Sequence, residues 1–244
     1  SCIHEPTRDF TTQPNTVARK VAAENEVGSI VSHVRETLFG ICSENSSTWI
    51  CIYKNPSYPQ PIGILIPRDF TASEFSPILF LHGYSFNTPR DESVGAIIKY
   101  FELPKALADS SASQLMIIPF SPGKNETYDQ FFKSQAALEG FVSLVFEDLK
   151  LGEPKRALRL VGHSGAFATI GRVLTNYSER APHLQIQSIA LLDSTYTGIN
   201  VGAFKGWLQT GEKQLFAAFI EKSPTEKGAR TLWSTLTKQP FKLS

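Results

Sequence analysis

The sequence lacks any apolar run that approaches the ~20 residues needed to cross a bilayer. It also lacks an excess of charge of either sign, because 24 Lys and Arg residues accompany 23 Asp and Glu residues and the formal net charge is +1. No basic run is longer than the one in "PKR" at 154–156. We therefore expect no transmembrane segment, and neither nucleic acid nor an anionic membrane as a partner.

Several motifs that would identify a function class are also missing. The sequence contains no Gly-rich phosphate loop, no dinucleotide-binding fingerprint, and no His, Cys and carboxylate cluster with metal-ligand spacing. We therefore expect no cofactor and no metal site. No internal repeat, low-complexity tract or linker between domains divides the chain either.

The chain has only 3 cysteines, and two of them flank a polar turn. Cys42 and Cys51 lie on either side of "SENSSTW", between two strand-like runs, so they form either a disulfide across a hairpin or two buried free thiols. Cys2 follows Ser at the start of the chain, a dipeptide that also remains around the cleavage point of bacterial lipoproteins. This predicts an exported protein that is periplasmic, lipid-anchored or secreted, while a cytoplasmic location stays open.

The order of apolar segments predicts the fold class. With 244 residues and 41% hydrophobic residues, the chain is expected to form one globular α/β domain over residues 29–244, after an irregular N-terminal arm over residues 1–28. A β-rich opening is followed by alternating strands and helices, which is typical of a parallel sheet covered by helices. The expected strands lie at 37–42, 49–53, 61–67, 76–84, 114–120, 157–162, 185–193 and 213–223, and the expected helices at 93–109 (broken by Pro104), 129–150, 166–179, 202–211 and 225–238.

Ser164 is the strongest candidate for a catalytic residue. The stretch "ALRLVGHSGAFATIGRVL" (157–174) runs from a buried strand directly into a helix through Gly162-His163-Ser164-Gly165-Ala166. This pattern requires small residues two positions before and after the serine, and it forces the serine into a strained left-handed turn. Ala166 replaces the usual second glycine and adds only a methyl group. The turn would raise the serine hydroxyl above the carboxyl edge of the sheet, with the N–H of Gly165 beside it.

A second strand ends in a turn that suits the same chemistry. "ILFLHGYSFN" (78–87) is a buried strand that ends in His82-Gly83, about 80 residues before Ser164. The glycine turn is expected to present a second backbone N–H, from Tyr84, so that Tyr84 and Gly165 form an oxyanion hole.

On these residues the chain resembles the α/β-hydrolases, a superfamily of serine hydrolases. The resemblance covers residues 60–236, through the His82-Gly83 turn, the Gly162–Ala166 elbow and the strand that ends in "ALLDS". It implies a mostly parallel sheet with helices on both faces, and the β-rich opening predicts antiparallel strands at its N-terminal edge. It also implies hydrolysis of an ester, amide or peptide bond through an acyl-serine, with a small molecule or a peptide as the substrate.

The family order is serine, then acid, then histidine, and two acids fit it. Asp193 ends "SIALLD", so its carboxylate is expected at the same sheet edge as Ser164. Glu221 ends "LFAAFIE", one strand later, which is the more usual family position. We favour Asp193 because it is shorter and follows a cleaner buried strand, although either carboxylate could instead cap the turn or helix after it.

Four residues close to these strand ends are expected to line the substrate pocket. Phe86 and Asn87 follow the oxyanion turn, and Thr195 and Tyr196 follow Asp193.

No histidine occurs after Asp193, so none stands where the resemblance implies the catalytic base. The chain has 5 histidines, at His4, His33, His82, His163 and His183. Without a base, a serine hydroxyl is a poor nucleophile at neutral pH. We expect that the C-terminal strand and histidine loop are missing from this chain and belong to a further segment or a second chain. The alternatives are a non-catalytic binding or scaffold domain on a degenerate hydrolase fold, His82 as an unusual base, or a different fold.

Overall fold

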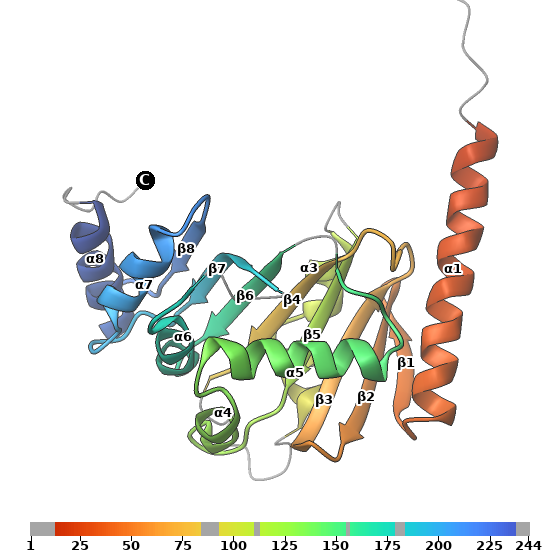
Figure 1. Cartoon of the computed structure of the whole chain (residues 1–244), viewed down its shortest axis with the longest axis horizontal. Helices are drawn as coiled ribbons and strands as arrows, with labels where there is room; N and C mark the ends of the chain where they lie inside the picture. Colours follow the sequence, from red (N-terminus) through yellow and green to blue (C-terminus); the bar gives the residue numbers. More distant parts are fainter. Residues whose placement is uncertain (1–12, 84–92, 110–112, 155–156, 179–183, 238–244) are drawn as a thin grey trace, which may run out of the picture.

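The computed structural model describes residues 13–83, 93–109, 113–154, 157–178 and 184–237, and all structural statements concern these segments. They form a sheet covered by helices (Figure 1). None of the helices in these segments is both long and apolar enough to span a membrane.

The sheet has eight strands in the order β1-β2-β3-β5-β4-β6-β7-β8. β1, β2 and β3 pair antiparallel, β3 also pairs antiparallel with β5, and the pairs from β5 through β4, β6 and β7 to β8 are parallel. The α/β class and the antiparallel N-terminal edge are therefore confirmed. The strands are β1 (Ile41–Asn45), β2 (Thr48–Asn55), β3 (Tyr58–Pro67), β4 (Ser76–Leu81), β5 (Gln114–Pro119), β6 (Leu158–His163), β7 (Ile186–Leu192) and β8 (Gln214–Ala218).

Helices cover both faces of the sheet, as expected for crossover connections between parallel strands. The link from β4 to β5 carries α2 and α3, which pack with the sheet in the smaller of two apolar clusters. α5 crosses the other face (Figure 1), where the larger cluster also includes residues of α1, α6 and α7. The helices are α1 (Gln13–Glu36), α2 (Val94–Tyr100), α3 (Leu103–Ala108), α4 (Glu126–Phe131), α5 (Gln135–Asp148), α6 (Ala166–Leu174), α7 (Val201–Leu208) and α8 (Pro224–Thr237).

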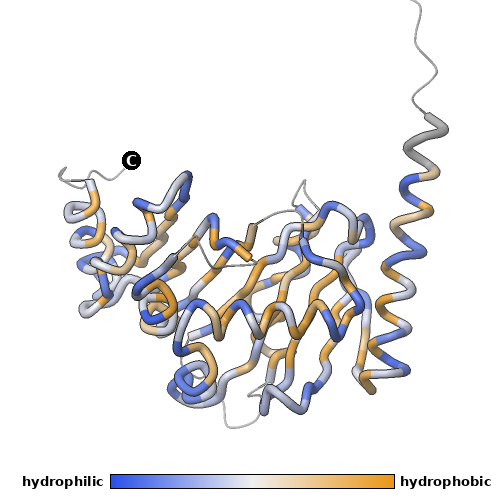
Figure 2. Tube along the Cα trace, in the orientation of Figure 1, coloured by the Kyte–Doolittle hydropathy of each residue, from blue (hydrophilic) through white to orange (hydrophobic). Residues whose placement is uncertain are grey.

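The central strands are the most apolar part of the fold. Every residue of β4 and of β5 is buried, whereas four of the five residues of edge strand β8 are exposed. Figure 2 shows the same distribution, with hydrophobic residues concentrated along the middle strands. A strand buried on both faces reads as a continuous apolar run, which is why "ILFL" and "LMII" are recognisable in the sequence.

The N-terminal region differs from the prediction. The sequence predicts an irregular arm over residues 1–28, but α1 begins at Gln13 and runs to Glu36. The C-terminal half of this helix packs against the sheet edge beside β1 (Figure 1), and this packing stabilises a helix whose polar sequence gave no periodic signal. The buried side chains of α1 are Ala23, Val27, Ile30, Val31 and Val34.

The hairpin of β1 and β2 resolves the alternatives for two of the cysteines. Cys42 and Cys51 lie directly opposite each other in the register of the two strands, and a disulfide joins them. The third, Cys2, lies outside the described residues.

Two other elements are shorter than predicted. The helix expected over 129–150 is divided into α4 and α5, because Ser134 caps a new helix by accepting a hydrogen bond from the N–H of Ala137. The strand expected over 213–223 ends at Ala218, where the chain enters a turn closed by a hydrogen bond from the N–H of Ser223 to the carbonyl of Ile220.

Candidate active site

Ser164 occupies the tight turn between β6 and α6. Its φ is 48°, in the left-handed region that few residues other than glycine adopt, so the predicted backbone geometry of the elbow is confirmed. A Cβ on Gly162 would lie 2.4 Å from the Cδ1 atom of Ile170 and 3.5 Å from the Cβ of Ala166. A side chain at this position would therefore require the end of the Ile170 side chain to shift, which is consistent with a small residue two positions before the serine. The side chain of Ser164 is half-buried.

The register of the parallel strands brings three loops together at the carboxyl edge of the sheet. Leu81 of β4 pairs with Gly162, and Leu192 of β7 pairs with His163. The chain beyond each strand therefore emerges beside Ser164, whose N–H donates to the carbonyl of Leu192 at 3.1 Å. In open α/β sheets this edge is where ligands bind.

Gly83 makes the closest approach to the serine from the β4 side. A Cβ at this position would lie 2.5 Å from the Cβ of Ser164 and 3.0 Å from the carbonyl oxygen of His163. Only glycine fits here without moving the elbow. Tyr84, Phe86 and Asn87, which we predict to complete the oxyanion hole and the pocket, lie outside the described residues.

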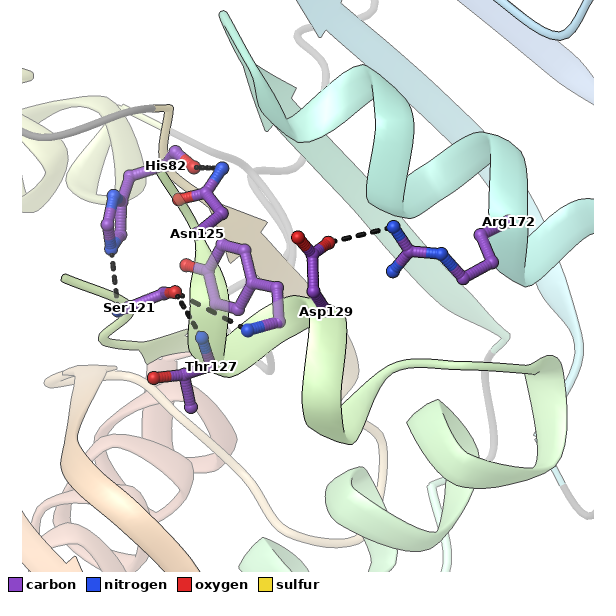
Figure 3. A network of polar contacts seen from close by, with 7 residues as sticks. His82, Ser121, Asn125, Thr127, Asp129 and Arg172 are labelled. Carbon is purple, nitrogen blue, oxygen red and sulfur yellow. Dashed lines mark hydrogen bonds and ion pairs between the residues drawn. The ribbon is translucent and has the colours of Figure 1, made fainter. Parts of the chain in front are cut away.

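His82 is the centre of a buried hydrogen-bond network (Figure 3). Its Nδ1 lies 2.8 Å from the carbonyl oxygen of Gly83, and its Nε2 accepts a hydrogen bond from the N–H of Ser121 at 3.0 Å. Asn125 donates through Nδ2 to the His82 carbonyl, and the Ser121 hydroxyl accepts from the N–H of Thr127. Both imidazole nitrogens are occupied, and the ring is 1% exposed. This arrangement favours a structural role and disfavours the alternative that His82 is the base.

Burial also determines the charge state of His82. The pKa of His82 is lowered to about 4, chiefly because burial removes the ring from water; the hydrogen bond to Gly83 raises the pKa and the nearby His163 lowers it, both to a smaller extent. The ring is therefore neutral at pH 7, with the proton on Nδ1 donated to Gly83.

His163 is next to the serine in sequence but lies on the side of the sheet covered by α2 and α3. Its ring packs edge-to-face on Phe101, with the ring centroids 4.7 Å apart. Burial lowers the pKa of His163, while the negative charge of Asp193 raises it. His33 lies far from this site, where its Nε2 is 2.9 Å from the carbonyl oxygen of Asp148. His4 and His183 lie outside the described residues.

The loop after β7 is fixed by hydroxyl groups. Asp193 has a φ of 46°, and its Oδ1 accepts a hydrogen bond from the hydroxyl of Thr225, in the first turn of α8. Ser194 donates to the Ser164 carbonyl at 2.5 Å, and Thr195 donates to the Thr225 carbonyl at 2.6 Å. Asp193 thus bonds to a side chain of α8, which is not the capping of the following turn or helix that we considered as its alternative role, at the edge where Ser164 also emerges. Thr195 is fully buried, and its hydrogen bond to Thr225 directs its hydroxyl toward α8.

The hydroxyl of Tyr196 lies close to that of the serine. The Tyr196 hydroxyl is 3.4 Å from Ser164 Oγ, and the Tyr196 ring packs on Phe167 with centroids 5.6 Å apart. Glu221, the alternative acid, is exposed in the turn after β8. Gly165 is the N-cap of α6, so its N–H stands at the N-terminus of the helix that follows the serine. Among the described residues, no group of three or more His, Cys, Asp and Glu could hold a metal ion.

Several residues that shape this edge were missed at the sequence level. Ser121 and Asn125 hold the His82 turn, while Thr225 and Gly228 hold the Asp193 loop. Gly228 lets α8 approach so closely that a Cβ there would lie 1.4 Å from the carbonyl oxygen of Thr195. The segment "SPGKNET" follows a strand end, which indicated that it could lie near the site. Its hydrogen-bond partner, His82, is distant in sequence and could not be inferred.

The strand order, the five parallel strands and the serine on a left-handed elbow after β6 together define the α/β-hydrolase fold. The resemblance inferred from the His82-Gly83 turn and the elbow is confirmed at this level.

Comparisons with known proteins agree with that fold. No protein-family model matches the sequence, and a comparison with curated proteins finds no match. Among solved structures, the chain is similar to a serine-to-alanine mutant of the feruloyl esterase module from Clostridium thermocellum, complexed with sinapinate. The TM-score is 0.53 and the identity 12%, over 82% of this chain and 74% of that chain.

Two further structures have lower TM-scores. A putative esterase from Staphylococcus aureus gives 0.49 at 12% identity, over 94% of this chain and 82% of that one. An S-formylglutathione hydrolase from Agrobacterium tumefaciens gives 0.47 at 10% identity, over 79% and 84%. The similarity to the feruloyl esterase module, at 12% identity, shows the fold alone, and function has to be inferred from the site.

Proposed function

We propose that this protein is a serine hydrolase that cleaves an ester through an acyl-serine on Ser164. The observation that carries the proposal is the φ of 48° at Ser164, on a turn that places the half-buried serine beside Gly83 and Tyr196. Strained backbone of this kind is maintained where the surrounding structure requires it, and it concentrates at functional sites. The feruloyl esterase module, with which the chain shares its fold, makes esters the first substrates to test.

The proposed reaction follows the usual steps of acyl transfer. Ser164 Oγ attacks the ester carbonyl carbon, its proton passes to a base, and the alcohol leaves with that proton as the carbon–oxygen bond breaks. The backbone N–H groups of Gly165 and Tyr84 are proposed to stabilise the oxyanion, and Asp193 to orient the base, with Glu221 as the alternative acid. The resulting acyl-serine is then hydrolysed by water. Amide and peptide substrates would use the same steps.

The base in this proposal is an imidazole from outside the described residues. His82 has both ring nitrogens occupied, and His163 packs on Phe101 on the side covered by α2 and α3. A further segment of the protein or a second chain would supply the group. A correctly placed base is worth roughly 10²- to 10⁴-fold in rate, so the 244-residue chain alone is expected to react slowly.

The test is covalent labelling with a fluorophosphonate probe, followed by intact mass, with and without added imidazole. We expect one phosphonyl group per chain, a labelling rate that rises with imidazole concentration, and no labelling of Ser164→Ala. Ser43→Ala, an exposed serine on the far edge of the sheet, serves as the control and should react like the unmodified chain. Labelling that persists in Ser164→Ala would exclude Ser164 as the nucleophile.

The second candidate is a non-catalytic binding domain on the same fold. The hydrogen bond between Asp193 and Thr225 favours it, because that contact gives the carboxylate a structural role without catalysis. A binding domain would show no phosphonylation at any imidazole concentration.

A further inference from the structure

We propose that Tyr196 is a catalytic residue whose hydroxyl donates a hydrogen bond to Ser164 Oγ and stabilises the negative charge that develops there. This inference rests on the proposed serine hydrolase function. The two oxygen atoms are 3.4 Å apart. Such contacts are often long before substrate binds and shorten in the reacting complex.

The position of Tyr196 is fixed by contacts on both sides of its loop. Ser194 ties the loop to the serine's own carbonyl, and Thr195 ties it to α8 through the Thr225 carbonyl. The Tyr196 carbonyl accepts a hydrogen bond from the N–H of Ile199 at 3.1 Å. These contacts hold the backbone on either side of the ring, so that little reorganisation is needed when charge develops on the serine.

The ring itself is supported by α6. Phe167, three residues after the serine, packs on the Tyr196 ring at an angle of 33°. The first turn of α6 therefore supports the tyrosine ring, and the turn that leads into the same helix carries Ser164. The ring and the proposed nucleophile are thus positioned by neighbouring parts of the chain.

The step that Tyr196 assists is the loss of the serine proton. As this proton passes to the imidazole base, negative charge grows on Oγ, and the phenolic O–H, which can donate and accept, donates to that oxygen. Tyr196 keeps its own proton throughout. When the bond from Oγ to the carbonyl carbon forms, the charge moves to the carbonyl oxygen and the tyrosine contact weakens. Tyr196 thus accelerates formation of the acyl-serine and transfers no proton.

Tyr196→Phe tests this directly, because it removes the hydroxyl and keeps the ring that packs on Phe167. The measurement is the rate constant for phosphonylation of Ser164 in the 244-residue chain at a fixed imidazole concentration. We expect labelling of Tyr196→Phe to be about 5- to 10-fold slower, as for the loss of one neutral hydrogen bond. Tyr100→Phe, at a tyrosine that is 66% exposed on α2, is the matched control and should label at the unmodified rate.

The outcomes separate this inference from the function on which it rests. If Tyr196→Phe reacts as fast as the unmodified chain while Ser164→Ala does not react, the tyrosine has no catalytic role and the serine hydrolase proposal stands. If Tyr196→Phe loses labelling completely, the tyrosine acts as the base and the hydrogen-bond role is wrong. If the unmodified chain is not labelled at any imidazole concentration, both proposals fail.

Discussion

The loop after β4 and the loop after β7 both reach Ser164, but different kinds of contact hold them. The first depends on a buried neutral imidazole, since His82 donates to Gly83 and accepts from Ser121. The second depends on hydroxyl groups and on a glycine in α8 that lets the helix backbone approach Thr195. The first loop is therefore expected to respond to pH, and the second to changes in side-chain volume.

The largest effect is expected from Gly228→Ala, which disrupts the β7 loop. The new Cβ would lie 1.4 Å from the Thr195 carbonyl oxygen, a backbone atom that cannot move without shifting the loop or α8. We expect a loss of at least ~3 kcal/mol in the free energy of unfolding, measured by urea denaturation.

Gly206→Ala is the matched control for that variant. Gly206 lies in α7, and a Cβ there would meet nothing within 4 Å. Because alanine is the better helix former, this change should leave stability unchanged or raise it by up to ~1 kcal/mol. Equal losses in both variants would show that the contact with Thr195 does not constrain the loop.

A smaller loss of stability but a large loss of reactivity is expected from Gly83→Ala. The new Cβ would lie 2.5 Å from the Cβ of Ser164, so the serine has to move. We expect phosphonylation of Ser164 to fall by about 100-fold, as for a displacement of ~1 Å from the reactive position. Gly95→Ala is the control, because its nearest neighbour would be an ordinary 3.7 Å away. A normal labelling rate in Gly83→Ala would mean that the β4 loop does not position the nucleophile.

A more gradual effect is a pH dependence that belongs to the β4 loop. The pKa of His82 is lowered from 6.5 to about 4 in the folded chain, so between these values the unfolded chain binds more protons. The stabilisation of the folded chain by neutral His82 is fully present above pH 6.5. It decreases as pH falls toward 4, by at most about 1.4 kcal/mol per pH unit. Urea denaturation at pH 7, 6 and 5 measures it.

Two variants distinguish the contribution of the β4 loop from that of the β7 loop in the urea denaturation experiment. His82→Gln should be less stable at pH 7 but lose less stability on acidification, although His163, whose pKa is also lowered, retains part of the slope. Thr195→Val should cost ~1 kcal/mol at every pH, because its hydrogen bond to Thr225 involves no titrating group. If the free energy of unfolding of His82→Gln changes with pH as steeply as that of the unmodified chain, the pH dependence belongs to other groups.

The features that could be predicted from the sequence are those that depend on residues close to one another in the chain. The elbow was recognisable because Gly162, Ser164 and Ala166 are close in sequence and the steric requirement of the turn is local. The buried strands were recognisable because β4 and β5 are continuous apolar runs.

The remaining features depend on contacts between distant residues. Nothing near Gly228 in sequence indicates that it meets the Thr195 carbonyl, and nothing near Asn125 indicates the His82 carbonyl. Helix α1 was missed because its stability comes from packing on the sheet edge and not from its polar sequence. The disulfide stayed undecided until the strand register placed Cys42 opposite Cys51.

The left-handed backbone of Ser164 has a consequence for stability. At a φ of 48°, glycine would relieve a conformational cost of roughly 1–2 kcal/mol that serine has to bear. Exchanging this serine for glycine should therefore make the folded chain more robust to heat while removing the one hydroxyl that the elbow carries.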